Sequence, residues 1–207
     1  MIVPYLAIFS YLYGMARKKE FDEAAILDKA VDLFWRNGYH ATSAQQLVDA
    51  LGISRSSIYD TYTDKRTLFL KALKQYQDRN ARALIQYINQ ATDAEQAVRG
   101  IFSGILQECA VDELNKGCFM VNTSIELAAM DPEIGAFVAE NNKNVEDALA
   151  RLVKKGQDAG QFSTRKSARA YARFLFGNIT ALRVSARSGG DKKVLQDIVD
   201  VTLSALK

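Results

Sequence analysis

Residues 42–65, TSAQQLVDALGISRSSIYDTYTDK, decide the fold, because they predict two short helices joined at one glycine. Ser43 followed by Gln46 forms a capping box, in which each side chain accepts a backbone amide at the start of a helix. Gly52 favours the left-handed conformation that ends such a helix. Ser54 can cap the helix that follows. The stretch therefore has the layout of a helix-turn-helix.

The two predicted helices differ in what they can bury. Leu47, Val48 and Leu51 recur at helical spacing and give the first helix an apolar face. The second helix has Ile58 as its one aliphatic residue and is otherwise polar or aromatic. We therefore expect the second helix to be presented to a partner. The major groove of DNA admits one α-helix and shows a different pattern of groups for each base pair, so double-stranded DNA is the partner that we predict.

Arg55 is the best candidate for a contact to a base edge, because its guanidinium matches guanine O6 and N7. Contact to phosphate is the alternative and is commoner for arginine overall. Asp64 can cap the next helix and Lys65 opens it, so free amides, the helix dipole and an ammonium can all face one phosphate. The remaining DNA-binding candidates carry hydroxyl or phenol groups: Thr42, Ser43, Ser54, Ser56, Ser57, Tyr59 and Tyr62. For the two tyrosines the alternative is that one packs inward beside Ile58.

Residues 24–73 resemble the DNA-binding domain of TetR-family transcriptional regulators. The resemblance covers about fifty residues and departs from the family at Tyr62, where Phe is more frequent, and at Asp60-Thr61. It rests on Phe34, Gly38-Tyr39, Thr42-Ser43, Leu51-Gly52-Ile53-Ser54, Ser57-Ile58-Tyr59, Tyr62, Asp64-Lys65 and Leu68.

The resemblance implies an all-α protein with two domains. We expect a three-helix helix-turn-helix DNA-binding domain over residues 16–66 and a helical ligand-binding and dimerisation domain over residues 67–207. It further implies a homodimer, a palindromic operator and an unknown small-molecule effector, with repression as the usual outcome. The composition agrees, since 207 residues with 48% hydrophobic content and two prolines favour helix throughout. The net charge of +3 lies within residues 15–90, as DNA backbone binding requires.

The first fifteen residues do not fit this pattern. Residues 1–14, MIVPYLAIFSYLYG, are apolar and aromatic, too short to span a bilayer, and lack the basic leader of a secretory signal. We interpret residues 1–15 as an extension that is not native, since the sequence from Met15, MARKKEFDEAAIL, resembles the ordinary beginning of a cytosolic protein. The alternative is a segment that packs on the protein surface or on another copy.

Further helices are expected along the rest of the chain. The segments are 64–90, 93–109, 118–130, 132–155, 167–187 and 191–206. Asp131-Pro132 gives a cap followed by a proline at the first helical position. The last two segments carry more apolar positions than one buried face needs, among them Phe174, Ile179 and Val201. They can form a four-helix bundle across a two-fold axis or complete the monomer core.

By the resemblance, the segments between residues 93 and 187 enclose an effector cavity. Asn122 and Glu126 are the most informative candidates, because they lie one turn apart in an apolar segment and buried polar groups need partners. A ligand is one such partner; a backbone group or a helix across the dimer is the alternative. The full set of ligand-binding candidates is Phe102, Leu106, Cys109, Phe119, Asn122, Glu126, Phe174 and Asn178, with Ile105, Ile125 and Tyr171 beside them, and ordinary core packing is the alternative for each.

Two cysteines without a secretory signal imply reduced thiols in a cytoplasmic protein. Cys109 and Cys118 flank a short loop, so a cysteine-based redox or electrophile sensor is an alternative function. An enzyme is not expected, because the single histidine, His40, lies away from both cysteines along the chain and no metal-ligand cluster or nucleotide fingerprint appears. We expect no cofactor, no metal and no membrane partner. A helical interaction protein that does not bind DNA is the remaining alternative.

Overall fold

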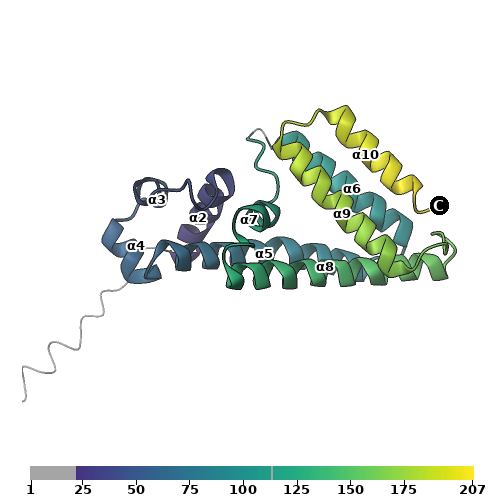
Figure 1. Cartoon of the computed structure of the whole chain (residues 1–207), viewed down its shortest axis with the longest axis horizontal. Helices are drawn as coiled ribbons and strands as arrows, with labels where there is room; N and C mark the ends of the chain where they lie inside the picture. Colours follow the sequence, from purple (N-terminus) through teal and green to yellow (C-terminus); the bar gives the residue numbers. More distant parts are fainter. Residues whose placement is uncertain (1–21, 113) are drawn as a thin grey trace, which may run out of the picture.

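The computed structural model describes residues 22–112 and 114–207, which form helices joined by short connections (Figure 1). The prediction for residues 1–15 lies outside this part of the chain. The all-α prediction is confirmed for the described residues. Their helices are α2 (Glu23–Asn37), α3 (Ala44–Leu51), α4 (Arg55–Tyr62), α5 (Lys65–Gln90), α6 (Ala94–Val111), α7 (Phe119–Leu127), α8 (Pro132–Asp158), α9 (Ala168–Arg187) and α10 (Lys192–Ser204).

The helix-turn-helix forms as its caps predict. The Ser43 side chain accepts the Gln46 amide at 3.2 Å, and the Gln46 side chain accepts the Ser43 amide at 2.8 Å. Gly52 ends α3 in the left-handed conformation with φ of 70°. Ser54 caps α4 by accepting the Ser57 amide at 3.1 Å. These local contacts define the ends of α3 and α4, which then pack on the core shared with α2 and α5.

Helices α2 to α4, the N-terminal domain, share one closely packed core. Phe34, Leu47 and Ile58 are buried there, and Phe69 from the start of α5 packs edge to face on Phe34 with ring centroids 5.1 Å apart. The same core extends into α7 through Phe119. The N-terminal domain is therefore packed directly on a helix of the C-terminal region.

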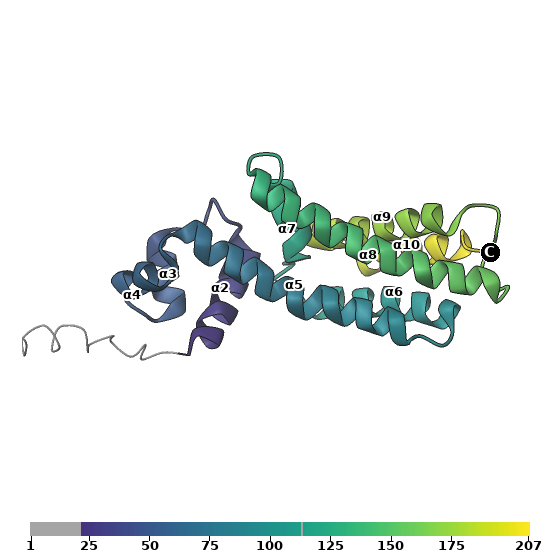
Figure 2. The same ribbon diagram turned by 90° about the horizontal axis from the view of Figure 1, so that it is seen from below.

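Two long helices, α5 and α8, run side by side and join the two ends of the molecule (Figures 1 and 2). Arg66 fixes their starts together, because its guanidinium donates to Asp131 at 2.8 and 3.0 Å and to Glu133 at 2.6 Å. Helices α6, α9 and α10 pack at the other end around a second core. None of the described helices combines the length and the hydropathy that a membrane span requires.

Candidate DNA-binding surface and effector cavity

The N-terminal end of α4 projects into solvent. Ser54, Arg55 and Ser56 are exposed there, while Ile58 on the opposite face is buried. The Ser54 hydroxyl lies 2.9 Å from those of Ser56 and Ser57, and the Arg55 guanidinium carbon lies 5.7 Å from the centre of the Tyr59 ring. Half-buried Tyr59 therefore supports an arginine that remains free to contact DNA.

Lys65 lies at the start of α5, just after the C-terminal end of α4. Its ammonium is 4.5 Å from the centre of the Tyr39 ring. Burial lowers the pKa of Lys65, and the carboxylate of Glu126 opposes that effect. Asp64 caps α5 by accepting the Thr67 amide at 2.6 Å, which lowers the pKa of the aspartate. The Lys65 ammonium therefore lies over the Tyr39 ring at the start of α5.

Thr42 and Tyr62, both predicted as phosphate ligands, are buried, and those two predictions are wrong for the side chains. Thr42 donates its hydroxyl to the Gly38 carbonyl at 2.6 Å. Tyr62 packs beside Ile58 in the core, as the alternative reading of the tyrosines allowed, and burial raises its pKa to about 12. Ser43 is exposed, although its side chain is engaged in the capping box. Burial distinguishes Thr42 and Tyr62 from the exposed Ser43, and the sequence alone does not show which of these polar side chains is buried.

Glu126 of α7 binds the N-terminal domain rather than a ligand. Its carboxylate accepts the Tyr39 amide at 2.9 Å and the His40 amide at 2.7 Å, at the corner between α2 and α3. Gly38 makes room for it, because a Cβ built at this glycine lies 2.7 Å from the carboxylate. The sequence-based assignment of Glu126 to the effector cavity is therefore wrong, and its partner is the backbone group named as the alternative.

The Lys116 carbonyl forms a second junction between the two halves of the molecule. It accepts Trp35 Nε1 of α2 at 3.1 Å, Asn122 Nδ2 of α7 at 2.9 Å and a guanidinium nitrogen of Arg187 of α9 at 2.8 Å. The Asn122 side chain thus has a backbone partner, which is the alternative named for it, and Asn122 does not line the inner cavity described below. Lys116 also pairs with Asp32 at 3.2 Å. One loop residue therefore links α2, α7 and α9.

A cavity of about 380 Å³, here called the inner cavity, lies between α5, α6, α8 and α9 and reaches the start of α7. Its walls are mainly apolar. The lining residues include Tyr76, Leu84 and Tyr87 of α5, Gly100, Ile101, Gly104, Ile105 and Glu108 of α6, Cys118 and Val121 at α7, Asn141 and Val145 of α8, and Phe176, Ile179 and Arg183 of α9. Its size falls in the range of cavities that bind small organic ligands.

Charged and polar groups gather at one end of the inner cavity. Arg183 pairs with Glu108 at 2.5 Å, and the Tyr76 hydroxyl donates to the Cys118 sulfur at 3.6 Å. Burial alone would lower the pKa of Arg183, but Glu108, Cys118 and Tyr76 together raise it. Burial also raises the pKa of Tyr76 well above its usual value, so the phenol stays a hydrogen-bond donor. This end therefore holds a permanent cation beside a thiol.

Apart from Ile105, the other residues predicted to bind a ligand do not line the inner cavity. The face of α6 that meets the cavity shares only Ile105 with the expected set. Phe102 and Tyr171 are buried in the C-terminal core, and Leu106 and Cys109 pack on it. Phe119 packs edge to face on Phe69 and Tyr76. Asn178 donates to the Phe174 carbonyl at 2.8 Å, and Phe174 and Ile125 are exposed.

A signal for the correct face of α6 was present in the sequence. Gly100, Gly104 and Glu108 recur at intervals of four, so they lie on one face of the helix. Residues without a Cβ leave space beside a helix, and that face lines the inner cavity. The pattern of small residues was therefore more informative than the aromatic residues.

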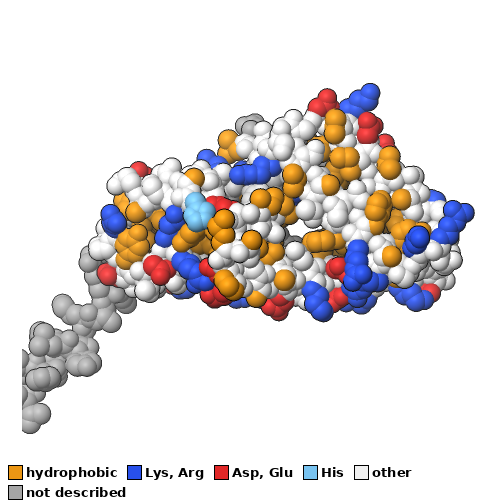
Figure 3. All heavy atoms as spheres, viewed as in Figure 1, with side chains coloured by type: hydrophobic (Ala, Val, Ile, Leu, Met, Phe, Trp, Pro, Cys, Tyr) orange, Lys and Arg blue, Asp and Glu red, His pale blue; other side chains and the backbone are white. Residues whose placement is uncertain are grey.

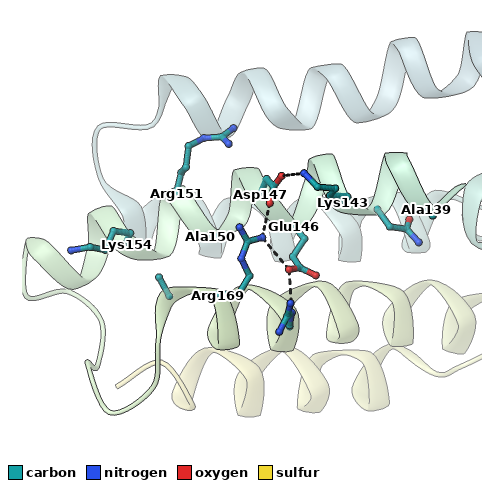
Figure 4. A pocket seen from close by; sticks show the side chains of 11 residues that line it. Ala139, Lys143, Glu146, Asp147, Ala150, Arg151, Lys154 and Arg169 are labelled. Carbon is teal, nitrogen blue, oxygen red and sulfur yellow. Dashed lines mark hydrogen bonds and ion pairs between the residues drawn. The ribbon is translucent and has the colours of Figure 1, made fainter. Parts of the chain in front are cut away.

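A more open hollow of about 1150 Å³ lies on the outside of α8 and α9 (Figure 4). The Arg169 guanidinium lies between Glu146 and Asp147, at 3.0 and 2.6 Å, and Lys143 pairs with Asp147 at 2.8 Å. Arg151 points away from these carboxylates (Figure 4). The hollow is thus a surface groove in which ion pairs join α8 to α9, and the inner cavity is the better candidate for a small-molecule site.

Comparison with known proteins decides the family. The description of bacterial regulatory proteins of the tetR family matches residues 26–72, and that of the tetracyclin repressor-like C-terminal domain matches residues 94–201. The chain belongs to the TetR family. It is 36% identical over 193 residues to the uncharacterized HTH-type transcriptional regulator YezE of Bacillus subtilis, which covers 93% of this chain and 100% of YezE. It is 31% identical over 188 residues to the HTH-type transcriptional repressor ComR of Escherichia coli, with 90% of each chain covered.

Solved structures of TetR-family regulators share the fold. A regulator from Agrobacterium tumefaciens superposes with a TM-score of 0.79 at 22% identity and covers 89% of this chain and 96% of its own. A cysteine mutant of CifR, solved with 26-bp double-strand operator DNA, gives a TM-score of 0.77 at 24% identity over 92% of this chain and 100% of CifR. As a TetR-family protein, the chain is a DNA-binding transcriptional regulator and not an enzyme. The alternative of an interaction protein that does not bind DNA is therefore not retained.

Proposed function

We propose that this TetR-family regulator is a cytoplasmic, ligand-responsive repressor that binds a palindromic operator as a homodimer. The observation that carries the proposal is the exposed start of α4, which presents Arg55 between two serines while its other face is buried. A relative of this chain, ComR, is named a transcriptional repressor. With α4 as the recognition helix, a dimer places two such helices on successive major grooves.

The DNA-binding part is tested with operator fragments selected from genomic DNA and measured by fluorescence anisotropy. We expect Arg55→Ala to weaken specific binding by about 10- to 100-fold and to change binding to random DNA much less. Lys65→Ala should weaken both alike and reduce the dependence on salt by about one counterion. Arg165→Ala, at an exposed arginine between α8 and α9, is the matched control. Equal effects of Arg55→Ala and Lys65→Ala on every sequence would remove Arg55 from the base-reading role.

Exposed apolar residues on α9 and α10 support the homodimer. Phe174 and Val184 lie on one side of α9, and Val194 and Val201 lie on α10, all solvent-exposed in the single chain. Figure 3 shows hydrophobic side chains over these helices on one face of the molecule. Gly177 lies between the two α9 residues, and a Cβ built there meets no atom within 4 Å, so a second helix can approach closely. This surface fits the four-helix bundle that the last two helices predict.

Sedimentation of a charged variant tests the dimer. Val201→Asp places an uncompensated charge within the apolar surface, so we expect it to convert the dimer to monomer. Ile125→Asp, at an exposed isoleucine on α7, is the control and should leave the dimer intact. A wild-type protein that sediments as a monomer at micromolar concentration overturns this part of the proposal.

The position of α7 supports a ligand response. The start of this helix lines the inner cavity through Cys118 and Val121, while Glu126 near its end binds the corner of the N-terminal domain. A ligand that shifts α7 therefore changes the position of α4 in each half of the dimer. It lowers operator affinity by its differential affinity for the two arrangements. A ligand that fills the cavity and leaves operator affinity unchanged contradicts this mechanism.

A thiol-based sensor is a second candidate, favoured by the position of Cys118. Its sulfur lies in the wall of the inner cavity beside the Tyr76 hydroxyl, whereas Cys109 packs on the C-terminal core. We expect an electrophile such as N-ethylmaleimide to release wild-type protein and Cys109→Ala from the operator but not Cys118→Ala. Unchanged release in both variants eliminates this function.

A further inference from the structure

The charged end of the inner cavity contains one enclosed cation. The Arg183 side chain is 19% exposed, lines the cavity and pairs with Glu108 at 2.5 Å. A buried guanidinium needs an anion, because an unpaired charge in an apolar surrounding is costly. Arg183 therefore remains charged, and the Glu108 carboxylate is the anion that pairs with it.

The two side chains of this ion pair differ in how far the protein encloses them. The Glu108 side chain is 63% exposed, so it can turn into water, whereas the 19% exposed Arg183 side chain then needs another anion. Arg183 has no such freedom, since the walls of the cavity surround it. The replaceable partner is thus the carboxylate, and the group that replaces it carries negative charge.

A further polar side chain lies at the same end. Arg66 and Asp131 join the starts of α5 and α8, which run in the same direction (Figure 2). Tyr76 and Asn141 each follow that pair by ten residues, so the helical rise predicts a similar height for both. Asn141 is 7% exposed and lines the cavity, and its amide makes one long hydrogen bond of 3.4 Å to Asn142. This amide can donate to an oxyanion beside Arg183, and the Tyr76 hydroxyl can do so by turning away from the Cys118 sulfur.

The rest of the cavity offers hydrocarbon contacts. Leu84, Ile101, Val145, Phe176 and Ile179 form its walls. Tyr76 and Tyr87 mark its two ends along α5, and eleven residues of helix span roughly 16 Å. At the far end Tyr87 lies against Gly100, where a Cβ would come within 2.2 Å of the phenol oxygen. The space fits an apolar body of limited length.

We propose that the inner cavity binds a small organic anion with a hydrocarbon body, whose carboxylate or similar oxyanion pairs with Arg183 in place of Glu108. This rests on the proposed function in taking the inner cavity as the effector site. A cationic ligand would have to displace the enclosed guanidinium, and a neutral apolar ligand would gain nothing from it. Both are outcomes of the test.

Calorimetric titration of the full-length protein without DNA tests the charge of the ligand. The probes are octanoate and 2-naphthoate, each beside its uncharged primary amide, and octylamine as the cation. We expect at least one carboxylate to bind at least tenfold more tightly than its amide, and octylamine not to bind. Amides that bind as tightly as both acids, or binding of octylamine alone, overturn the proposal, as does the absence of binding by either carboxylate.

Variants locate the contact. Arg183→Gln should weaken binding of the carboxylate at least tenfold, whereas Arg173→Gln on the outer side of the same helix should not change it. Glu108→Gln removes the competing carboxylate and should tighten binding several-fold, so the test stands even if Arg183→Gln fails to fold. Weaker binding to folded Glu108→Gln overturns the proposal.

Operator binding is measured separately by anisotropy, so the two proposals fail in different ways. Carboxylate binding without release of the operator supports the anion site and contradicts the ligand-responsive part of the proposed function. Operator binding by a protein whose cavity takes neither carboxylate leaves the DNA-binding proposal intact and overturns the anion site.

Discussion

The N-terminal domain and the C-terminal region are built from the same kind of helix but differ in how their interiors are filled. In the first, Phe34, Leu47 and Ile58 close the space between α2, α3 and α4, and each end of the two short helices is capped. In the second, α5, α6, α8 and α9 leave a cavity of about 380 Å³ between them. The difference matches the two parts of the proposed function, in which a closely packed unit presents α4 in one orientation and a unit with internal space binds a ligand.

The largest expected effect comes from emptying the filled core. Phe34→Ala should lower the free energy of unfolding by about 3–5 kcal/mol, since it leaves a void beside Phe69. Ile179→Ala, at the wall of the inner cavity, should cost about 1–2 kcal/mol because its side chain is half-buried and space already lies beside it. Guanidinium unfolding followed by circular dichroism at one protein concentration measures both. Equal losses would contradict the contrast between the two interiors.

The second largest effect is expected when the contact between the N-terminal domain and α7 is broken. Glu126→Ala leaves the Tyr39 and His40 amides without an acceptor, which should cost about 1–3 kcal/mol. We expect faster hydrogen exchange at these two amides and weaker operator binding. Ile125→Ala, at a side chain that is 73% exposed, is the neighbouring control and should stay within about 0.5 kcal/mol of the wild type. Unchanged exchange in Glu126→Ala would show that the corner does not depend on α7.

Matched cap substitutions compare the two regions directly. Ser54 caps α4 and Ser167 caps α9, each by accepting the amide three residues later, at 3.1 and 3.2 Å. Ser54→Ala and Ser167→Ala should each cost about 1 kcal/mol. Ser54→Ala alone should weaken operator binding, measured by anisotropy, because it loosens the presented end of α4. A loss of operator affinity in Ser167→Ala as well would mean that α9 influences DNA binding as strongly as α4.

The smallest expected effect is the loss of stability in acid that comes from the pair of Arg66 and Asp131, which joins α5 to α8. The Arg66 guanidinium, with the amides at the start of α8, lowers the pKa of Asp131 from 3.8 to about 2. Its contribution to stability is therefore complete above pH 3.8 and is lost as the pH falls toward 2. Asp131→Asn keeps a good helix cap, so unfolding measured from pH 5 to pH 2 should fall less steeply in this variant. The same slope in both proteins would assign the acid sensitivity to other carboxylates.

The accuracy of the sequence-based predictions follows the range of the interactions involved. The capping box of α3, the left-handed Gly52 and the Asp64 cap depend on residues three or four positions apart, and all three are confirmed. The partners of Glu126 and Asn122 are backbone groups of loops, and for Glu126 they lie 86 and 87 positions away. No local pattern encodes such a contact.

The cavity lining was mispredicted for a related reason. One residue along an α-helix turns the side chain by about 100°, so Ile101 lines the cavity while Phe102 packs in the core. Helix α6 is apolar on more than one side, and its sequence alone does not tell which side meets a space. The orientation is set by packing among four helices, and Arg183 meets Glu108 only through that packing.

The chain has one tryptophan, and it lies at the junction of the two regions. Trp35 donates its indole N–H to the Lys116 carbonyl, and the Lys116 ammonium is 4.6 Å from the centre of its ring. A nearby charge and a hydrogen bond both tune the emission colour of an indole. The unlabelled protein thus carries an optical probe at the loop that connects α2, α7 and α9, and a change in its emission would report a change at this loop.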